Sequence, residues 1–246
     1  MPIPKVLLWV LLTVFVLPLG FSVSAQELTG NALLVKAIQY HDPNKNWSSF
    51  KGALTITMAT PNSSDRSTKI QIDFPAQFFS STVQKDGNTI ISTLDKEDCT
   101  QMLNGSAEIP KAARDSLRIS CDRAKMTQDY YTYLYGLPMK LKDAGTNIYE
   151  TVQKKAFKGK EYLVLKVDYK EAVGKDTWYF YFDPKTYALE VYQFYHDESK
   201  NDGEYILLTE TMEVNDIKMP KIRAWYYNKD NAYLGTDTLS EAEGLE

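Results

Sequence analysis

The chain has 246 residues, of which 24% are charged and 13% aromatic, and this composition excludes an intrinsically disordered protein. The formal net charge is −4 and the basic residues are scattered, so the sequence predicts no nucleic-acid partner. The composition includes 17 Tyr, which favours β-strands because Tyr suits a pleated, half-buried surface.

Residues 1–25 have the pattern of a secretory signal peptide. Lys5 supplies a positive charge, residues 6–19 are almost wholly apolar, and Val23-Ser24-Ala25 offers small residues for cleavage before Gln26. The apolar run is short for a membrane span, which needs roughly 20 residues, although an uncleaved anchor is the alternative. No later segment is apolar for long enough to span a bilayer. We therefore expect an exported protein, periplasmic or extracellular, with no transmembrane anchor after cleavage.

The two cysteines, Cys99 and Cys121, both follow this segment. In an oxidising compartment an even pair is most simply one disulfide, and a redox-active pair is the alternative. The spacing does not resemble the Cys-x-x-Cys motif of redox proteins, so we expect a structural disulfide.

The first expected element is a helix over residues 29–42, with Thr29 as its N-cap and Pro43 after its end. The apolar period then changes to two, which is typical of half-buried strands. Short strands separated by turn residues are expected over residues 50–58, 70–74, 78–84, 89–94 and 99–103.

The middle of the chain differs from both ends. A weak helix is expected over residues 110–117 and a stronger one over residues 127–137, where Tyr130, Tyr133 and Leu134 share a face. The stronger helix is apolar nearly all round, so it must be covered on most sides.

Strands return in the last hundred residues. They are expected over residues 148–157, 161–169, 177–183, 189–196, 204–214, 217–228 and 232–238. Asp183 is expected to accept backbone hydrogen bonds in a hairpin turn. No linker or repeat interrupts the pattern, so residues 26–246 are expected to form one domain.

The count of about 11–12 strands exceeds what a flat sheet holds comfortably, so the sheet should curl. The expected fold class is mainly β: a strongly curved antiparallel sheet, or unclosed β-barrel, with a helix before it. The helical insertion over residues 127–137 is expected to lie against the concave face.

This order of elements resembles the periplasmic lipoprotein carriers of the LolA and LppX type, in which helices lie over an unclosed β-barrel. The resemblance covers most of residues 28–240, including a Tyr-Phe-Asp-Pro-Lys-Thr turn at 181–186. Segments 130–138 and 218–227 are more closely similar to a secreted family of Bacteroidota that has no established activity. The resemblance implies an exported protein and a cavity for an acyl chain. The cysteine pair and the high Tyr content depart from the carriers.

The sequence shows no motif for catalysis or metal binding. His41 and His196 lie in no recognised metal-ligand spacing, and no nucleophile elbow, phosphate loop or dinucleotide fingerprint is present. The acidic clusters fall in apparent turns. We therefore expect no catalytic residue, no metal and no cofactor.

Three functions stay open at this point. The first is a non-enzymatic module that binds a lipid or another amphipathic molecule. Its expected ligand-binding residues are aromatic or apolar, with one arginine for a head group: Tyr130, Tyr131, Leu134, Trp178, Phe180, Phe182, Phe194, Trp225 and Arg223. The second is an envelope structural or interaction protein whose core fills itself and whose exposed tyrosines meet a protein partner. The third is a hydrolase of unknown substrate.

Overall fold

The computed structural model describes the first residue and residues 27–245, so the predicted signal peptide over residues 1–25 lies outside the described residues apart from its first. One sheet of 13 strands dominates the described part. Within residues 27–245, no helix combines the length and the apolar content that crossing a bilayer requires.

The sheet begins with five consecutive hairpin strands and continues with eight more after a helical insertion. The strands are β1 (Lys51–Thr60), β2 (Ser63–Asp73), β3 (Phe78–Lys85), β4 (Asn88–Asp95), β5 (Asp98–Leu103), β6 (Thr146–Ile148), β7 (Gln153–Phe157), β8 (Lys160–Tyr169), β9 (Thr177–Phe182), β10 (Leu189–Tyr195), β11 (Glu204–Val214), β12 (Ile217–Tyr227) and β13 (Tyr233–Gly244). The helices are α1 (Gly30–His41), α2 (Lys111–Leu117) and α3 (Cys121–Gly136), with short 3₁₀ turns η1 (Asn46–Ser49), η2 (Met139–Lys142) and η3 (Glu198–Lys200).

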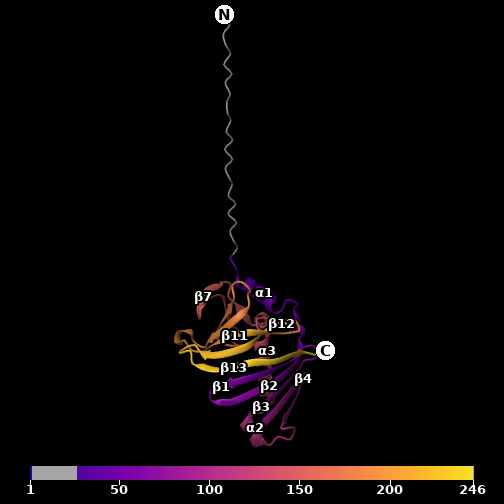
Figure 1. Cartoon of the computed structure of the whole chain (residues 1–246). Coiled ribbons are helices and arrows are strands. Elements are labelled where there is room, and N and C mark those ends of the chain that lie inside the picture. The colour runs from indigo at the N-terminus through magenta and orange to yellow at the C-terminus, as the bar shows by residue number, and fades with distance from the viewer. Residues whose placement is uncertain (2–26, 246) are drawn as a thin grey trace.

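The strand order is β5-β4-β3-β2-β1-β13-β12-β11-β10-β9-β8-β6, and β7 also pairs with β8. All of these pairings are antiparallel, and the sheet curves without closing on itself (Figure 1). The predicted mainly-β fold with a curved, unclosed antiparallel sheet is therefore confirmed.

One predicted strand, over residues 148–157, is two strands in the structure. Both β6 and β7 pair with β8, and Tyr149 N still donates to Lys166 O of β8 at 3.1 Å, but residues 150–152 between them are not in register with β8. They meet the start of α1 instead: Gly30 N donates to Glu150 O at 2.7 Å, and Thr29 forms a bridge with Thr151. A side chain on Gly30 would collide with Tyr149 O, so this close approach requires glycine. The break accounts for the thirteenth strand.

Helix α1 confirms the first predicted element. The Thr29 side chain accepts a hydrogen bond from Ala32 N at 3.2 Å and caps the helix. Leu33, Leu34 and Ala37 are fully buried on its inner face. The apolar stripe seen in the sequence thus packs α1 onto the sheet.

The helical insertion joins the two ends of the sheet. The chain leaves the edge strand β5, forms α2, α3 and η2, and re-enters the sheet at β6, the last strand of the opposite end. Because the sheet is curved, this connection crosses its concave side, where α3 lies (Figure 1). The expected position of the helical insertion is confirmed.

Helix α3 begins earlier than predicted, at Cys121 and not at Thr127. The Ser120 side chain accepts a hydrogen bond from Arg123 N at 3.1 Å, which starts the helix there. Its first turns carry polar residues and gave no apolar stripe to detect. The predicted disulfide is present: Cys121 is bonded to Cys99 of β5, with the two Cα atoms 6.0 Å apart.

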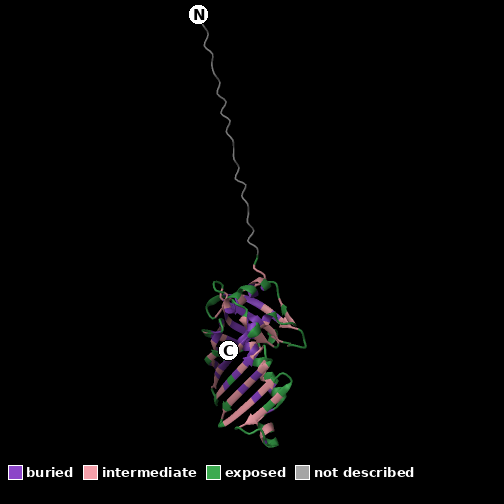
Figure 2. Cartoon of the chain, turned by 90° about the vertical axis from the view of Figure 1, so that its right-hand side faces the viewer, coloured by how far each residue is buried: buried purple, intermediate pink, exposed green. Residues whose placement is uncertain are grey.

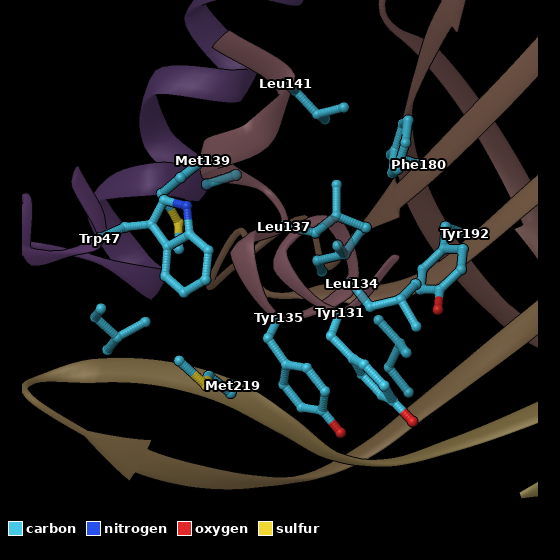
Figure 3. Close-up of a cluster of buried hydrophobic side chains, with 14 of the residues drawn as sticks. Trp47, Tyr131, Leu134, Tyr135, Leu137, Met139, Leu141, Phe180, Tyr192 and Met219 are labelled. Carbon is cyan, nitrogen blue, oxygen red and sulfur yellow. The ribbon is translucent and has the colours of Figure 1, made fainter. Parts of the chain in front are cut away.

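The hydrophobic core occupies one part of the concave side. Figure 2 shows buried residues gathered in the upper half of the molecule, while the lower strands carry mostly residues of intermediate burial. In the core, Tyr131 and Tyr135 extend in the same direction from α3, and Leu134 lies between that helix and Tyr192 of β10 (Figure 3). The concave side is therefore filled by its own side chains over β8–β12 and less completely filled over β1–β5.

Strand β9 has both of its faces covered by other parts of the protein. Phe180 and Phe182 are fully buried in the main core, and the alternate residues Tyr179 and Tyr181 are buried in a second, outer cluster. Phe157 of β7 covers that cluster, with its ring 5.3 Å from the ring of Tyr181. The aromatic side chains of β9 thus fill the main core on one face of the strand and the outer cluster on the other.

Candidate ligand-binding site

A cavity of about 480 Å³ lies between the concave face of strands β1–β5 and the helices α2 and α3. It is lined by Met58, Arg66, Thr68, Ser81, Val83, Ile90, Ser92, Gln101, Leu117, Arg118, Ile119, Ser120, Arg123, Ala124, Met126, Thr127, Tyr130 and Tyr131. Half of these residues are apolar or aromatic. The volume falls in the range of about 300–1,000 Å³ that is typical of small-molecule sites.

The floor of the cavity follows from strand alternation. In β2, Arg66 and Thr68 line the cavity, while their neighbours Ser67 and Lys69 do not, because successive side chains point to opposite faces. Small side chains continue the floor: Ser81 of β3 pairs in register with Ser92 of β4. Small residues at inward positions leave the space that bulky residues fill elsewhere under the sheet.

A polar row crosses this floor. Ser92 of β4 pairs in register with Gln101 of β5, so Ser81, Ser92 and Gln101 lie side by side across three strands. Arg114 Nη1 donates to Gln101 Oε1 at 3.1 Å, but Gln101 Nε2 has no hydrogen-bond partner. The hydroxyl of Thr68, which is 1% exposed, also lacks a partner. The interior of the cavity therefore offers polar atoms that the protein itself does not satisfy.

The roof of the cavity is the first part of α3. Ala124 and Tyr131 are buried against the sheet, whereas Met126 is 59% and Tyr130 40% exposed. Burial raises the pKa of the Tyr131 phenol, and nearby Arg66 opposes that shift. Two large apolar side chains therefore reach solvent at the cavity, and a tyrosine and an arginine lie close together beside it.

The last turn of α3 is held by a buried arginine. Arg223 is 1% exposed, and its guanidinium donates to Leu134 O and Pro220 O, both at 3.0 Å. The guanidinium carbon also lies 4.0 Å from the ring centroid of Tyr135. Across the sheet, Arg223 pairs in register with Asp237, whose pKa is raised by burial and lowered in turn by Arg223. These groups form a buried polar cluster beside the core.

The predicted ligand-binding residues fall into two sets. Tyr130 and Tyr131 line the cavity. The others do not line it and belong to the core or its border: Leu134, Trp178, Phe180, Phe182, Phe194, Trp225 and Arg223. Trp178 packs on Phe194 with ring centroids 4.8 Å apart, and Trp225 Nε1 donates to Asp237 Oδ2 at 3.1 Å. A direct role of this second set in ligand binding stays a prediction.

The sequence reasoning missed Arg66, Ser81 and Ser92. A signal was present in the sequence. Arg66 and Thr68 are an even number of residues from Ile70 and Ile72 in β2, so their side chains had to point to the same inward face. An arginine at an inward position of β2, together with the small inward residues Ser81 and Ser92 in the next two strands, indicates a polar cavity and not a packed core.

The two histidines are placed differently from each other. His41 is buried, with Nδ1 2.7 Å from Lys218 O, and its Nε2 accepts a hydrogen bond from Leu189 N at 2.9 Å. Burial lowers the pKa of its imidazole to about 4. His196 is exposed and contacts Asp176 Oδ1 at 2.7 Å, which raises its pKa. In the part of the chain that the structure covers, no group of three His, Cys, Asp or Glu side chains is arranged to hold a metal ion.

Comparison with solved structures supports the fold. A domain from Vibrio parahaemolyticus described as an outer membrane lipoprotein-sorting protein is 13% identical, with a TM-score of 0.50, and the match covers 87% of this chain and 93% of that one. This likeness shows a shared fold.

Two further structures are similar at slightly lower scores. A LolA superfamily protein from Nitrosomonas europaea is 10% identical over 89% of this chain and 94% of that one, with a TM-score of 0.49. A DUF1329 family protein from Desulfovibrio piger is 9% identical, and the match covers 87% of this chain and 92% of that one, also with a TM-score of 0.49.

A search among proteins with curated descriptions found no match to this chain. A family model, described as a family of unknown function, matches residues 7–242. Since that match spans nearly the whole sequence, the chain belongs to the DUF6503 family.

Proposed function

We propose that this protein is an exported, non-enzymatic binding protein that holds a lipid or another amphipathic molecule between β1–β5 and α3. The observation that carries the proposal is the cavity of about 480 Å³, which has apolar walls and unsatisfied polar atoms. Burial of apolar ligand surface contributes roughly 25 cal/mol per Å² before the costs of binding. Residues 26–246 act in this proposal as one LolA-like domain.

Three features support export as part of the proposal. Residues 1–25 have the pattern of a signal peptide, and the mature part carries the Cys99–Cys121 disulfide, which persists in oxidising compartments. The similar Vibrio domain is described as an outer membrane lipoprotein-sorting protein. Carriage of a lipid through the periplasm would fit all three.

Binding is favoured over hydrolysis by the state of His41. His41 does not line the cavity, both of its ring nitrogens form hydrogen bonds inside the protein, and burial lowers its pKa to about 4, which makes it a weak base. The second candidate is an envelope interaction protein. It is favoured by Tyr227 and Tyr233, which are 46% and 43% exposed at the hairpin of β12 and β13.

Binding of Nile red, an uncharged fluorescent probe of apolar cavities, tests the proposal on delipidated mature protein. We expect saturable binding to the wild type and a loss of about tenfold or more in affinity for Ser92→Phe, because the new ring fills the cavity floor. Thr93→Phe is the matched control, since residue 93 belongs to the same strand but points to the opposite face.

The proposal would be overturned by a wild type that does not bind Nile red and carries no lipid in native mass spectrometry. It would also fail if Ser92→Phe, folded by circular dichroism, bound the probe as well as Thr93→Phe does.

A further inference from the structure

We infer that the ligand of this cavity is a single-chain amphipath with an anionic head group, a carboxylate or a phosphate, and that Arg66, Arg118 and Arg123 bind that head group. The inference rests on the proposed function and gives its ligand a chemical class. It comes from the charge, the unsatisfied polar atoms and the size of the cavity.

The charged residues of the cavity wall are all of one sign. Arg66 comes from β2, Arg118 from the end of α2 and Arg123 from the first turn of α3. No Asp or Glu belongs to the described lining of the cavity. Three separate segments therefore bring guanidinium groups to one space, although the whole chain has a formal net charge of −4.

These arginines are not neutralised by carboxylates of the protein. Within residues 27–245, every ion pair is made by a lysine or a histidine, and none by Arg66, Arg118 or Arg123. Arg66 Nη2 donates at 3.1 Å to the sulfur of Met58, a weak acceptor. Asp237 interacts with Arg66 electrostatically, but it does not line the cavity, and it also faces Arg223.

Guanidinium groups bind carboxylate and phosphate oxygens well because their planar set of N–H donors matches two oxygens at once. An anionic head group at the cavity would provide the anionic oxygen acceptors that these three guanidinium groups lack. A cationic head group would be repelled by all three.

Two further donors in the cavity lack an acceptor. The Thr68 hydroxyl is 1% exposed and unpartnered, and it lies two residues from Arg66 on the same face of β2. Gln101 Nε2 is likewise unpartnered. A buried polar atom without a partner costs free energy, so an oxygen-rich ligand, which can accept hydrogen bonds from both, is stabilised here more than a hydrocarbon is.

The volume of the cavity is sufficient for one acyl chain. A methylene group is close in size to a water molecule, whose share of liquid volume is about 30 Å³. About 480 Å³ therefore corresponds to roughly 16 such groups, which is one acyl chain. Met58, Val83, Ile90 and Ile119 provide apolar surface for it.

The test is displacement of bound Nile red by a series of ligands that share one 14-carbon chain. The series comprises tetradecanoate, tetradecyl phosphate, 1-monotetradecanoylglycerol and tetradecyltrimethylammonium, each kept below its micellar concentration. We expect the two anions to compete about tenfold better than the uncharged glycerol ester, and the cation to compete worst. Added salt should reduce the difference in affinity between the charged ligands and the uncharged ester, because it screens the arginine charges. The ratio of the affinities for tetradecanoate and tetradecyl phosphate shows which of the two head groups the cavity prefers.

The variant Arg66→Gln/Arg118→Gln/Arg123→Gln separates charge from shape. It should lose about tenfold or more in affinity for the anions and bind Nile red and the glycerol ester within about twofold of the wild type. Lys125→Gln is the control, because it removes one positive charge from α3 outside the cavity lining. Melting curves show whether each variant is folded.

Equal competition by anionic and uncharged ligands at the wild type would overturn this inference and leave the proposed function intact. Unchanged binding of the anions by the triple variant would overturn it as well. Failure of the wild type to bind Nile red, together with no lipid in native mass spectrometry, would instead overturn the proposed function itself.

Discussion

The guanidinium of Arg223 in β12 donates a hydrogen bond to the main-chain oxygen of Leu134, 3.0 Å away in the last turn of α3. At the first residue of the same helix, Cys121 is bonded to Cys99 of β5. Helix α3 is therefore attached to the sheet at both ends, and Tyr130 lies between the two attachments at the cavity. The two attachments differ in kind, so they can be removed separately.

Removal of the disulfide should loosen only the first part of α3. We expect Cys99→Ala/Cys121→Ala to lower the free energy of unfolding by about 3 kcal/mol, because the crosslink constrains the unfolded chain. Urea denaturation measures the loss, and reduced wild type should match the variant. In hydrogen exchange, amides 121–127 should exchange faster, while amides near Leu134 stay protected by Arg223. Equal acceleration at both ends of α3 would contradict this account.

Removal of Arg223 should destabilise the whole protein. Arg223→Met leaves the buried carboxylate of Asp237 without the cation that faces it in register, and it leaves Leu134 O without its donor. We expect a loss of about 3 kcal/mol or more in urea denaturation.

A double-mutant cycle shows whether the two charged groups act together. Arg223→Met/Asp237→Asn should cost less than the sum of the two single variants, because the double variant buries no unpaired charge. Additive costs would mean that Asp237 is stabilised mainly by other groups, such as Trp225 Nε1.

The buried His41 predicts a loss of stability in mild acid. Its pKa is about 4 in the folded protein and near 6.5 when unfolded, so the folded state favours the neutral ring. The contribution to stability is fully present above pH 6.5 and falls as the pH drops toward 4, by about 3 kcal/mol. Melting temperatures from pH 7 to pH 4 measure it. His41→Gln should be less stable at pH 7 but should depend less on pH over this window.

His196 is the control, because its pKa is shifted in the opposite direction from that of His41. Asp176 raises the pKa of its ring, so its contribution is present at low pH and lost as the pH rises through the folded pKa. The effect should be small because the side chain is 63% exposed. His196→Gln should therefore leave the acid loss in place or make it slightly steeper. If His196→Gln abolished the loss, His41 would not be its source.

The turn after β9 should depend on Asp183. Its carboxylate accepts from Lys185 N at 2.9 Å and Thr186 N at 2.8 Å, as expected from the sequence, and it pairs with Lys160 at 2.7 Å. These contacts, led by Lys160, hold the pKa of Asp183 below its usual value, so the stabilisation is lost in acid as the carboxylate is protonated. Asp183→Ala should cost about 1–2 kcal/mol, and Asp183→Asn less, because Asn keeps the backbone acceptor. Equal costs in thermal melts would assign the effect to the ion pair.

Most of the architecture was predictable because strands, hairpin turns and the cysteine pair are local patterns. Period-two alternation identified the strands, and Thr29 marked the start of α1. The start of α3 was not predictable from apolar spacing, because Ser120 begins it and its first turns are polar. The resemblance of segments 130–138 and 218–227 to a secreted family of Bacteroidota stays a prediction.

The position of the cavity was harder to predict than its existence. Bulky residues such as Phe180 and Trp225 suggested an aromatic ligand pocket, but bulk is what fills a core, and both pack within it or at its border. The cavity lies where inward residues are small, as at Ser81 and Ser92. Neither serine stands out in a single sequence, since only the register between neighbouring strands shows that they face each other.

The position of β13 in the sheet has a consequence for how the protein folds during its synthesis. Gly52 of β1 pairs with Gly244 of β13, so the sheet is joined through partners that are far apart in the chain. Such non-local pairing gives a high contact order and slow folding. A nascent chain that has not yet reached residue 233 carries two half-sheets with unpaired edges, which are prone to aggregation unless a chaperone covers them.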